Sequence, residues 1–286
     1  MTSRAGAWVL RGLTSLTLAF IYLPLLVIFL YAFNDKRSLV WPIDGLTTRW
    51  FGRAIDNPGV RDALLVSLKA ALGATALALV LGSLAAMAVA RYRFFGRDAI
   101  SFLVILPIAL PGIVTGMALN ATFRNLPEPF GVDLGLFTIM VGHATFCIVV
   151  VYNNVVARLR RTAASLEEAS ADLGADSWQT FRYVTFPQLK TALLAGGLLA
   201  FALSFDEVIV TTFTAGADQT LPIWILNNLS RPNQLPIVNV VAVFVIVLSM
   251  VPVYFASKLS SESAGGGATG AKGRVGARTP HVPSGR

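Results

Sequence analysis

Two adjacent acids, Asp206 and Glu207, stand inside an otherwise apolar stretch of the sequence. A charge within a membrane-spanning helix costs on the order of 2–3 kcal/mol and usually faces a cavity or a partner. Ser204, just before them, adds a hydroxyl group to the same cluster. Since neighbouring helical residues point about 100° apart, we expect only one acid to line a pathway. The cluster predicts a negative site for a cationic solute; a structural hydrogen bond to another helix or to a second subunit is the alternative.

A second polar segment lies between two long apolar stretches and has the pattern of a short surface helix. Ser165 and Glu168 form a capping-box pattern, which predicts a helix that begins at Leu166. Gly174 supplies the left-handed residue that ends this helix. One stripe at helical spacing consists of Leu166, Ala169, Ser170 and Leu173. Because small side chains let another backbone approach closely, the stripe indicates a docking surface for another protein; an ordinary amphipathic hairpin is the alternative.

The capping pattern then repeats. Asp176 and Gln179 predict the start of a second short helix, and Pro187 is expected to end it. The apolar face of this second helix consists of Trp178, Phe181 and Val184. Residues 165–187 are therefore expected to form a pair of short helices on a membrane surface.

The composition places this pair of helices in a membrane protein. The 286 residues are 55% hydrophobic and only 13% charged, whereas soluble globular proteins carry roughly a quarter charged residues. Apolar segments of about 20 residues, enough to cross a bilayer, occur at 12–33, 65–90, 100–123, 134–157, 189–213 and 235–257. Proline and glycine residues in the third segment predict a kinked or broken helix. We expect an all-α polytopic membrane protein with six transmembrane helices.

Six spans place both termini on one side of the membrane, and the basic residues indicate which side. Alternate loops and the chain ends carry Arg4, Arg11, Arg91, Arg93, Arg97, Arg158, Arg160, Arg161 and Lys258. The opposite loops carry only Arg124 and Arg231, apart from the stretch between the first two spans, where acids accompany the basic residues. By the positive-inside rule, the termini and the docking segment are cytoplasmic. The net charge of +8 is thus a topology signal, and no nucleic-acid partner is expected.

Other chemistry has little support. Cys147 is the only cysteine, which excludes an intrachain disulfide. His143 and Cys147 share a helical face, but two ligands do not complete a metal site. No glycine-rich phosphate loop precedes a helix, so the chain is not expected to hydrolyse ATP. We expect no catalytic residue, metal or cofactor, and we interpret the first apolar segment as an uncleaved anchor.

The polar segment resembles the cytoplasmic signature of the membrane-spanning subunits of binding-protein-dependent ABC importers. That signature reads Glu-Ala-Ala, three residues, Gly, nine residues, then an aliphatic residue, any residue, an apolar residue and Pro. The matching residues are Glu168-Ala169-Ser170, Gly174 and Val184-Thr185-Phe186-Pro187, with both spacings kept. Ser170 replaces the second Ala, and Phe186 stands where Leu is usual.

The resemblance implies a type I ABC importer permease fold. Residues 1–11 would be a cytoplasmic N-terminus, 12–257 a permease domain with a coupling-helix loop at 158–188, and 258–286 a disordered cytoplasmic tail. The residues implied in coupling to the ATPase are Glu168, Ala169, Ser170, Gly174 and Pro187. The implied partners are cytoplasmic ATPase subunits, a second permease subunit and an extracytoplasmic solute-binding protein, in a bacterial inner membrane with both termini cytoplasmic.

A closer resemblance concerns the solute. The dipeptides Phe33-Asn34 and Trp50-Phe51 and the segment Ser204-Phe205-Asp206-Glu207-Val208 are similar to spermidine/putrescine permeases of the second subunit kind. The resemblance implies polyamine import by alternating access, with Asp206, Glu207, Ser204 and Trp50 along the pathway. Trp50 suits an ammonium over its ring, although it also suits an interfacial belt.

The sequence departs from that branch at one position and leaves other solutes open. Gly112 stands where polyamine relatives often carry an acid. The same kind of importer for ferric ion, thiamine, sulfate or a phosphonate is an alternative. A secondary transporter or a membrane scaffold is a further alternative, but secondary carriers often show inverted repeats over ten or more spans.

Overall fold

The computed structural model describes residues 4–37, 40–43, 45–127 and 131–265. Its regular secondary structure there is helical, apart from an isolated antiparallel bridge between Asn34 and Leu46. The helices are α1 Arg4–Ala32, α2 Arg49–Asp56, α3 Pro58–Arg91, α4 Arg97–Ala109, α5 Gly112–Arg124, α6 Leu136–Arg161, α7 Ser165–Asp172, α8 Ser177–Thr180, the π-helical turn η1 Phe181–Thr185, α9 Phe186–Phe205, α10 Ile209–Thr214, α11 Leu221–Asn228 and α12 Leu235–Gly265. The all-α prediction is confirmed.

The membrane-spanning helices match the apolar segments of the sequence. In the described part of the chain, five helices are long and apolar enough to cross a membrane: Gly6–Ala32, Pro58–Arg91, Leu136–Arg161, Ser177–Phe205 and Leu235–Leu259. The pair α4 and α5 gives a sixth if it is counted as one span, and its two helices meet at an angle of 106°. Pro111 precedes α5 and lacks an amide to continue the helix. The break expected in the third segment is confirmed.

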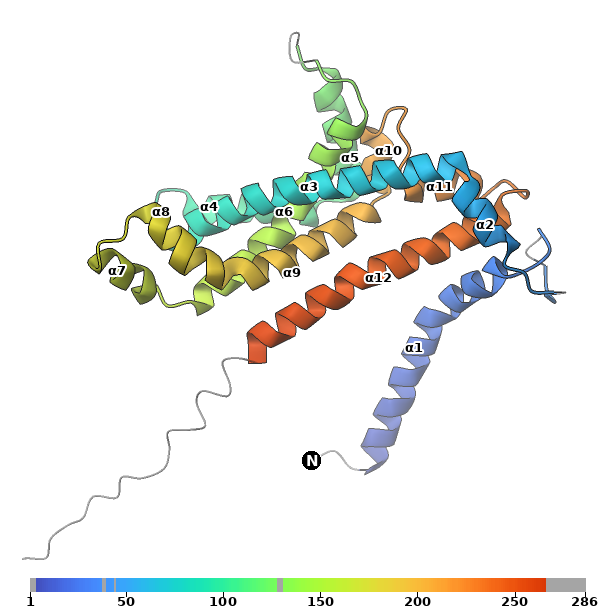
Figure 1. Ribbon diagram of the computed structural model, residues 1–286, viewed down its shortest axis with the longest axis horizontal. Helices are drawn as coiled ribbons and strands as arrows, with labels where there is room; N and C mark the ends of the chain where they lie inside the picture. Colours follow the sequence, from blue (N-terminus) through green and yellow to red (C-terminus); the bar gives the residue numbers. More distant parts are fainter. Residues whose placement is uncertain (1–3, 38–39, 44, 128–130, 266–286) are drawn as a thin grey trace, which may run out of the picture.

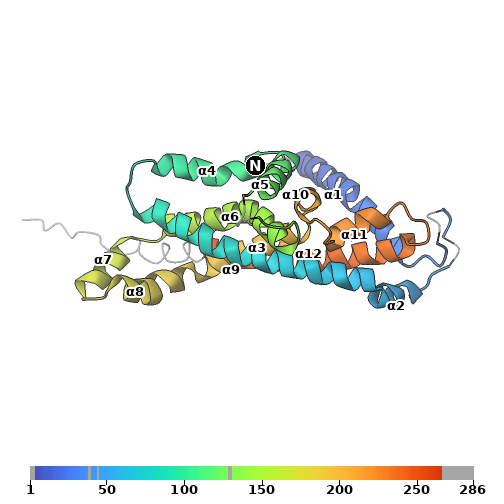
Figure 2. The same cartoon turned by 90° about the horizontal axis from the view of Figure 1, so that it is seen from above.

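Helices α3, α6 and α9 pack against one another in the middle of the bundle (Figures 1 and 2). Small buried residues line this face of α3: Ala70, Ala71, Ala74, Ala78, Gly82 and Ala86. Lipid is as apolar as a leucine side chain, so membrane helices associate largely through close van der Waals packing, which small residues allow. Helices α3 and α6 approach closely at Gly82, where an added methyl group would lie 2.9 Å from the carbonyl oxygen of Ile148.

The remaining long helices extend this core outward. Helix α12 packs on α9, and α1 contacts α12. Helices α7 and α8 lie at one end of the bundle, whereas α2 lies at the opposite end (Figures 1 and 2). The long span α9 therefore connects the end that carries α7 and α8 with the interior of the bundle.

Two expected boundaries fall inside helices. Helix α1 begins at Arg4, so most of residues 1–11 continues the first span. Helix α12 continues to Gly265, so the change from permease domain to tail expected at residue 258 is not a helix end. The rest of the predicted disordered tail, residues 266–286, lies outside the described residues.

The close approach of α3 and α6 generates a stability prediction. Replacing Gly82 by Ala should lower the midpoint of thermal unfolding of the detergent-purified protein, because the new methyl group meets a backbone oxygen. Overpacking of this kind typically costs about 1–3 kcal/mol.

Gly197→Ala in α9 is the matched control. It also replaces a helical glycine, but its methyl group would lie 3.4 Å from the Leu79 side chain, an ordinary contact. Equal midpoints for the two variants would contradict the packing described.

Candidate functional site

The docking segment forms a hairpin of two short helices, α7 and α8, but its first cap differs from the expectation. The predicted capping box of Ser165 and Glu168 is wrong. Ala164 precedes α7 with helical backbone angles, and its carbonyl oxygen accepts from the amides of Glu167 and Glu168 at 2.9 and 3.2 Å. Ser165 is therefore inside the helix, where its backbone does not have the extended geometry of a capping residue.

The turn between α7 and α8 forms as the sequence predicts. Gly174 has a φ angle of +84°, in the left-handed region that favours glycine. The amide of Ala175 donates to the carbonyl oxygen of Ser170 at 3.1 Å, which closes the helix end. The second capping box is confirmed, since Asp176 accepts from the amide of Gln179 at 2.8 Å and the Gln179 side chain accepts from the Asp176 amide at 3.0 Å.

Pro187 does not end the second helix, so that prediction is wrong. The chain continues from α8 through the π-helical turn η1 into α9 as one apolar helix, Ser177–Phe205. Within the turn, the amide of Phe186 donates to the carbonyl oxygen of Phe181. Pro187 then falls in the first turn of α9, where a residue without an amide is tolerated. The hairpin and the fifth span are thus joined without a loop.

An ion pair that the sequence analysis missed ties the hairpin to α3. One carboxylate oxygen of Glu167 lies 3.0 Å from Nη2 of Arg91, accepts from Nε of Arg91 at 3.2 Å and accepts from the Thr185 hydroxyl at 3.1 Å. Both charged side chains are less than a quarter exposed. Glu168, the acid of the signature, is exposed instead. No local pattern identifies the Arg91 partner, because the two residues are 76 positions apart.

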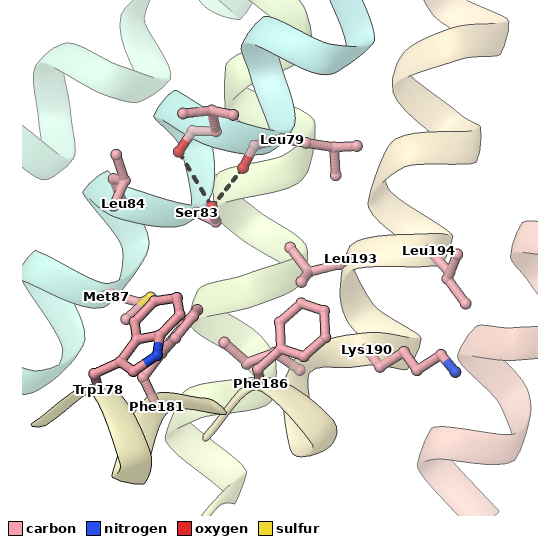
Figure 3. A pocket seen from close by; sticks show the side chains of 12 residues that line it. Leu79, Ser83, Leu84, Met87, Trp178, Phe181, Phe186, Lys190, Leu193 and Leu194 are labelled. Atoms are coloured by element: carbon pink, nitrogen blue, oxygen red, sulfur yellow. Dashed lines mark hydrogen bonds between the residues drawn. The ribbon is translucent and has the colours of Figure 1, made fainter. Parts of the chain in front are cut away.

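The outer face of the hairpin presents apolar side chains. Leu173 is 89% exposed, and Leu166 and Trp178 are also largely exposed. An apolar groove of about 720 Å³ runs beside it, between α3 and α9 (Figure 3). Trp178, Phe181 and Phe186 line its lower part, and Lys190 is its charged lining residue. Exposed apolar patches of this kind mark surfaces that another molecule covers.

The acid pair lies at a break between two helices. The sequence analysis placed Asp206 and Glu207 inside a continuous helix, and this is wrong: α9 ends at Phe205 and α10 begins at Ile209. Glu207 ends the break, because its Oε1 accepts from the amide of Val210 at 3.0 Å in the first turn of α10. A carboxylate in this position satisfies an otherwise unpaired amide of the new helix.

A buried histidine of α6 bonds to both sides of this break. Nδ1 of His143 lies 2.8 Å from the Ser204 hydroxyl at the end of α9, and Nε2 lies 2.8 Å from the Thr211 hydroxyl of α10. The Thr211 hydroxyl also donates to the carbonyl oxygen of Glu207 at 2.7 Å. Ser204, expected to line the pathway, is buried in this network. The sequence pattern argued against a metal site at His143 and gave no indication of this role.

Glu207 also lines a small cavity. The cavity has a volume of about 160 Å³ and lies beside the break between α4 and α5. Its lining residues are Pro107, Ile108, Leu110, Gly112, Thr115, Phe146, Leu203, Glu207 and Val210. Asp206 is exposed and is not among them. The two helix breaks therefore meet at one cavity whose charged group is Glu207.

Trp50 is not at this cavity. It is 1% exposed in α2, and its indole nitrogen donates to the carbonyl oxygen of Asn34 at 2.8 Å. The guanidinium carbons of Arg49 and Arg53 lie 4.5 and 5.0 Å from its ring centroid. The ring is thus covered by cations of the chain itself, and its burial differs from that of an interfacial-belt tryptophan.

The described residues contain no group of three or more His, Cys, Asp or Glu side chains that could hold a metal ion. His143 is already bonded through both nitrogens, and Cys147 donates to the carbonyl oxygen of Ala200. Both side chains therefore make hydrogen bonds within the bundle.

Comparison with known proteins places this architecture in a family. A family model described as the inner membrane component of binding-protein-dependent transport systems matches residues 78–261. The putrescine transport system permease protein PotI of Escherichia coli (strain K12) is 34% identical over 232 residues, which cover 79% of this chain and 82% of PotI. The spermidine/putrescine transport system permease protein PotC of the same strain is 32% identical over 261 residues, which cover 91% of this chain and 96% of PotC.

Solved structures agree in fold at lower sequence identity. A bacterial ABC transporter involved in the import of the acidic polysaccharide alginate contains a chain with a TM-score of 0.63 and 18% identity, with 92% of this chain and 98% of that chain covered. The inward-facing MetNI methionine ABC transporter contains one with a TM-score of 0.56 and 16% identity, with 75% and 97% covered. Together with the family match over more than half of its length, these findings show that the chain belongs to the inner membrane components of binding-protein-dependent transport systems.

Proposed function

We propose that this chain is the permease subunit of an ATP-driven importer that carries linear polyamines across the plasma membrane by alternating access. The observation that carries the proposal is the Glu207 carboxylate beside a cavity at the meeting point of two helix breaks. Broken helices within a membrane are tolerated where they line a cavity, and such cavities are common solute sites in transporters.

The charge of the cavity favours a cation. A carboxylate in a low-dielectric cavity attracts an ammonium group far more strongly than in bulk water. The relatives PotI and PotC are named as putrescine and spermidine/putrescine permeases, and both solutes are linear polycations. A sulfate or phosphonate would be repelled by Glu207, so these alternatives have less support. Asp206, exposed next to Glu207, would add a second negative charge at the mouth of the site.

The proposed pathway therefore contains Glu207, Asp206 and the supporting hydroxyl of Ser204. Trp50, whose ring is covered by Arg49 and Arg53, is left out of it. Gly112, which stands where polyamine relatives often carry an acid, lines the same cavity as Glu207.

The hairpin would couple the pathway to ATP hydrolysis by a partner subunit. The exposed Glu168, Ala169 and Leu173 would contact the ATPase, while Gly174 shapes the turn and Pro187 the junction with α9. A second permease subunit would complete the pathway, and a solute-binding protein would deliver the polyamine on the outer side. In this orientation both termini and the hairpin are cytoplasmic, and α2 lies on the outer side.

The first prediction from this proposal tests the pathway. The attraction between two opposite unit charges about 4 Å apart is about 4 kcal/mol at an effective dielectric constant of 20. Glu207→Gln removes the carboxylate charge that would attract the ammonium group. We therefore expect it to lower kcat/KM for putrescine or spermidine uptake by more than about tenfold. Asp206→Asn should have the smaller effect, since Asp206 does not line the cavity. The glutamine can still accept from the Val210 amide, so membrane abundance should not change. Normal uptake by both variants would refute the assignment.

The second prediction tests coupling. Gly174→Val should cost on the order of 1–2 kcal/mol at a left-handed residue, and uptake and solute-stimulated ATPase activity should fall together. In the part of the chain that the structure describes, no atom beyond the two adjoining residues lies within 4 Å of an added Cβ, so backbone strain is the expected cause. Gly174→Asn is the matched control, because asparagine tolerates this conformation. Transport by the valine variant at the normal rate would mean that the hairpin does not couple.

The third prediction tests topology by cysteine labelling in intact cells. Ser165→Cys should react only with a membrane-permeant reagent, and Asp56→Cys, near Asn57, should also react with an impermeant one. Background labelling should be low, because the native Cys147 is fully buried. Labelling of Ser165→Cys from outside would reverse the proposed orientation.

A further inference from the structure

For a neutral imidazole, the hydrogen bonds around His143 favour one arrangement of protons. The Thr211 hydroxyl donates to the carbonyl oxygen of Glu207, so it accepts from Nε2 of His143. In a neutral imidazole Nδ1 is then an acceptor, and the Ser204 hydroxyl donates a hydrogen bond to it. The chain of bonds begins in α9, passes through α6 and α10, and ends on the backbone of Glu207.

Glu207 is held at two points by this arrangement. Its carbonyl oxygen accepts from Thr211, and its Oε1 accepts from the Val210 amide at 3.0 Å. No hydrogen bond to Oε2 of Glu207 is made by any residue that the structure describes. The backbone and one carboxylate oxygen are therefore fixed, which leaves the other oxygen for a solute in the adjoining cavity.

Burying an imidazole at this position costs free energy, so packing alone does not explain why a histidine is there. His143 is fully buried, and a buried polar ring is unfavourable unless its nitrogens are bonded. Phe146, whose ring centroid lies 5.6 Å away, supplies a hydrocarbon ring to the same part of α6. The Ser204 and Thr211 hydroxyls, on the two sides of the break, supply hydrogen bonds to both imidazole nitrogens.

We propose that His143 is a positioning residue for the solute site: it holds residues 206–208 in the shape that presents the Glu207 carboxylate to the cavity. It does not touch the solute itself. The inference rests on the proposed role of Glu207, and it adds a residue on a different helix that determines the geometry of that carboxylate.

Uptake kinetics of labelled putrescine test the proposal. His143→Phe fills the space without bonding, and we expect it to raise KM about tenfold, as the loss of one or two buried hydrogen bonds would, while Vmax changes less than about twofold. His143→Gln keeps a donor and an acceptor and should recover part of the loss. In a Glu207→Gln background, His143→Phe should raise KM no further.

A matched control lies on the same helix. Tyr152 is buried in α6 and donates to the Ser101 hydroxyl at 3.1 Å, on the part of α6 that packs against α4. Tyr152→Phe removes a hydrogen bond from α6 without touching the break, so its KM should equal that of the wild type.

A second readout does not depend on the solute. The rate at which a hydrophobic carbodiimide modifies Glu207, followed by mass spectrometry, should change severalfold in His143→Phe and stay constant in Tyr152→Phe. Unchanged KM and unchanged labelling in His143→Phe would overturn the proposal, as would failure of both His143 variants to accumulate. If Glu207→Gln transports normally, the proposed function fails, and the labelling rate alone then decides whether His143 positions the carboxylate.

Discussion

Backbone amides and carbonyls inside a bilayer have no water to bond with, and the rest of this structure depends on that constraint. Two of its spans are nevertheless broken, at Pro111 and at residues 206–208. The second break persists because side chains supply what the helix has lost: the Thr211 hydroxyl bonds to the Glu207 carbonyl and the Glu207 carboxylate bonds to the Val210 amide. The break thus borders the cavity and also fixes the orientation of the Glu207 carboxylate that lines it.

The docking hairpin and the acid site lie at opposite ends of one helix. Helix α8, the turn η1 and α9 run without interruption from Ser177 to Phe205, with α7 and the Gly174 turn just before the start and Asp206 and Glu207 immediately after the end. The Arg91–Glu167 ion pair adds a link from the hairpin to α3, which packs along α9. Movement of the hairpin by an ATPase would therefore reach the acid site through a continuous helix and its neighbour, which requires no separate relay.

The sequence predicted most of what depends on local pattern, apart from the Ser165–Glu168 cap, and missed what depends on tertiary contacts. Periodicity and composition identified the six apolar segments, and proline and glycine identified the break in the third. Gly174 and the Asp176 capping box formed as expected because each needs only nearby residues. No proline or glycine marks the break at residue 206. Side chains on α6 and α10 stabilise it instead, and these tertiary contacts cannot be read from the local sequence. The prediction for Pro187 was wrong because the π-helical turn η1, which has no sequence signature, precedes it and places it in the first turn of α9.

The central claim is that a negative cavity at a helix break makes this family member an importer of linear polycations. The most direct test is the ATPase activity of the assembled importer, with its binding protein, in proteoliposomes exposed in turn to putrescine, spermidine, ferric ion, thiamine, sulfate and a phosphonate. The account predicts stimulation by putrescine or spermidine, together with ATP-dependent uptake of the same solute. Stimulation by sulfate or the phosphonate, with no response to either polyamine, would contradict it.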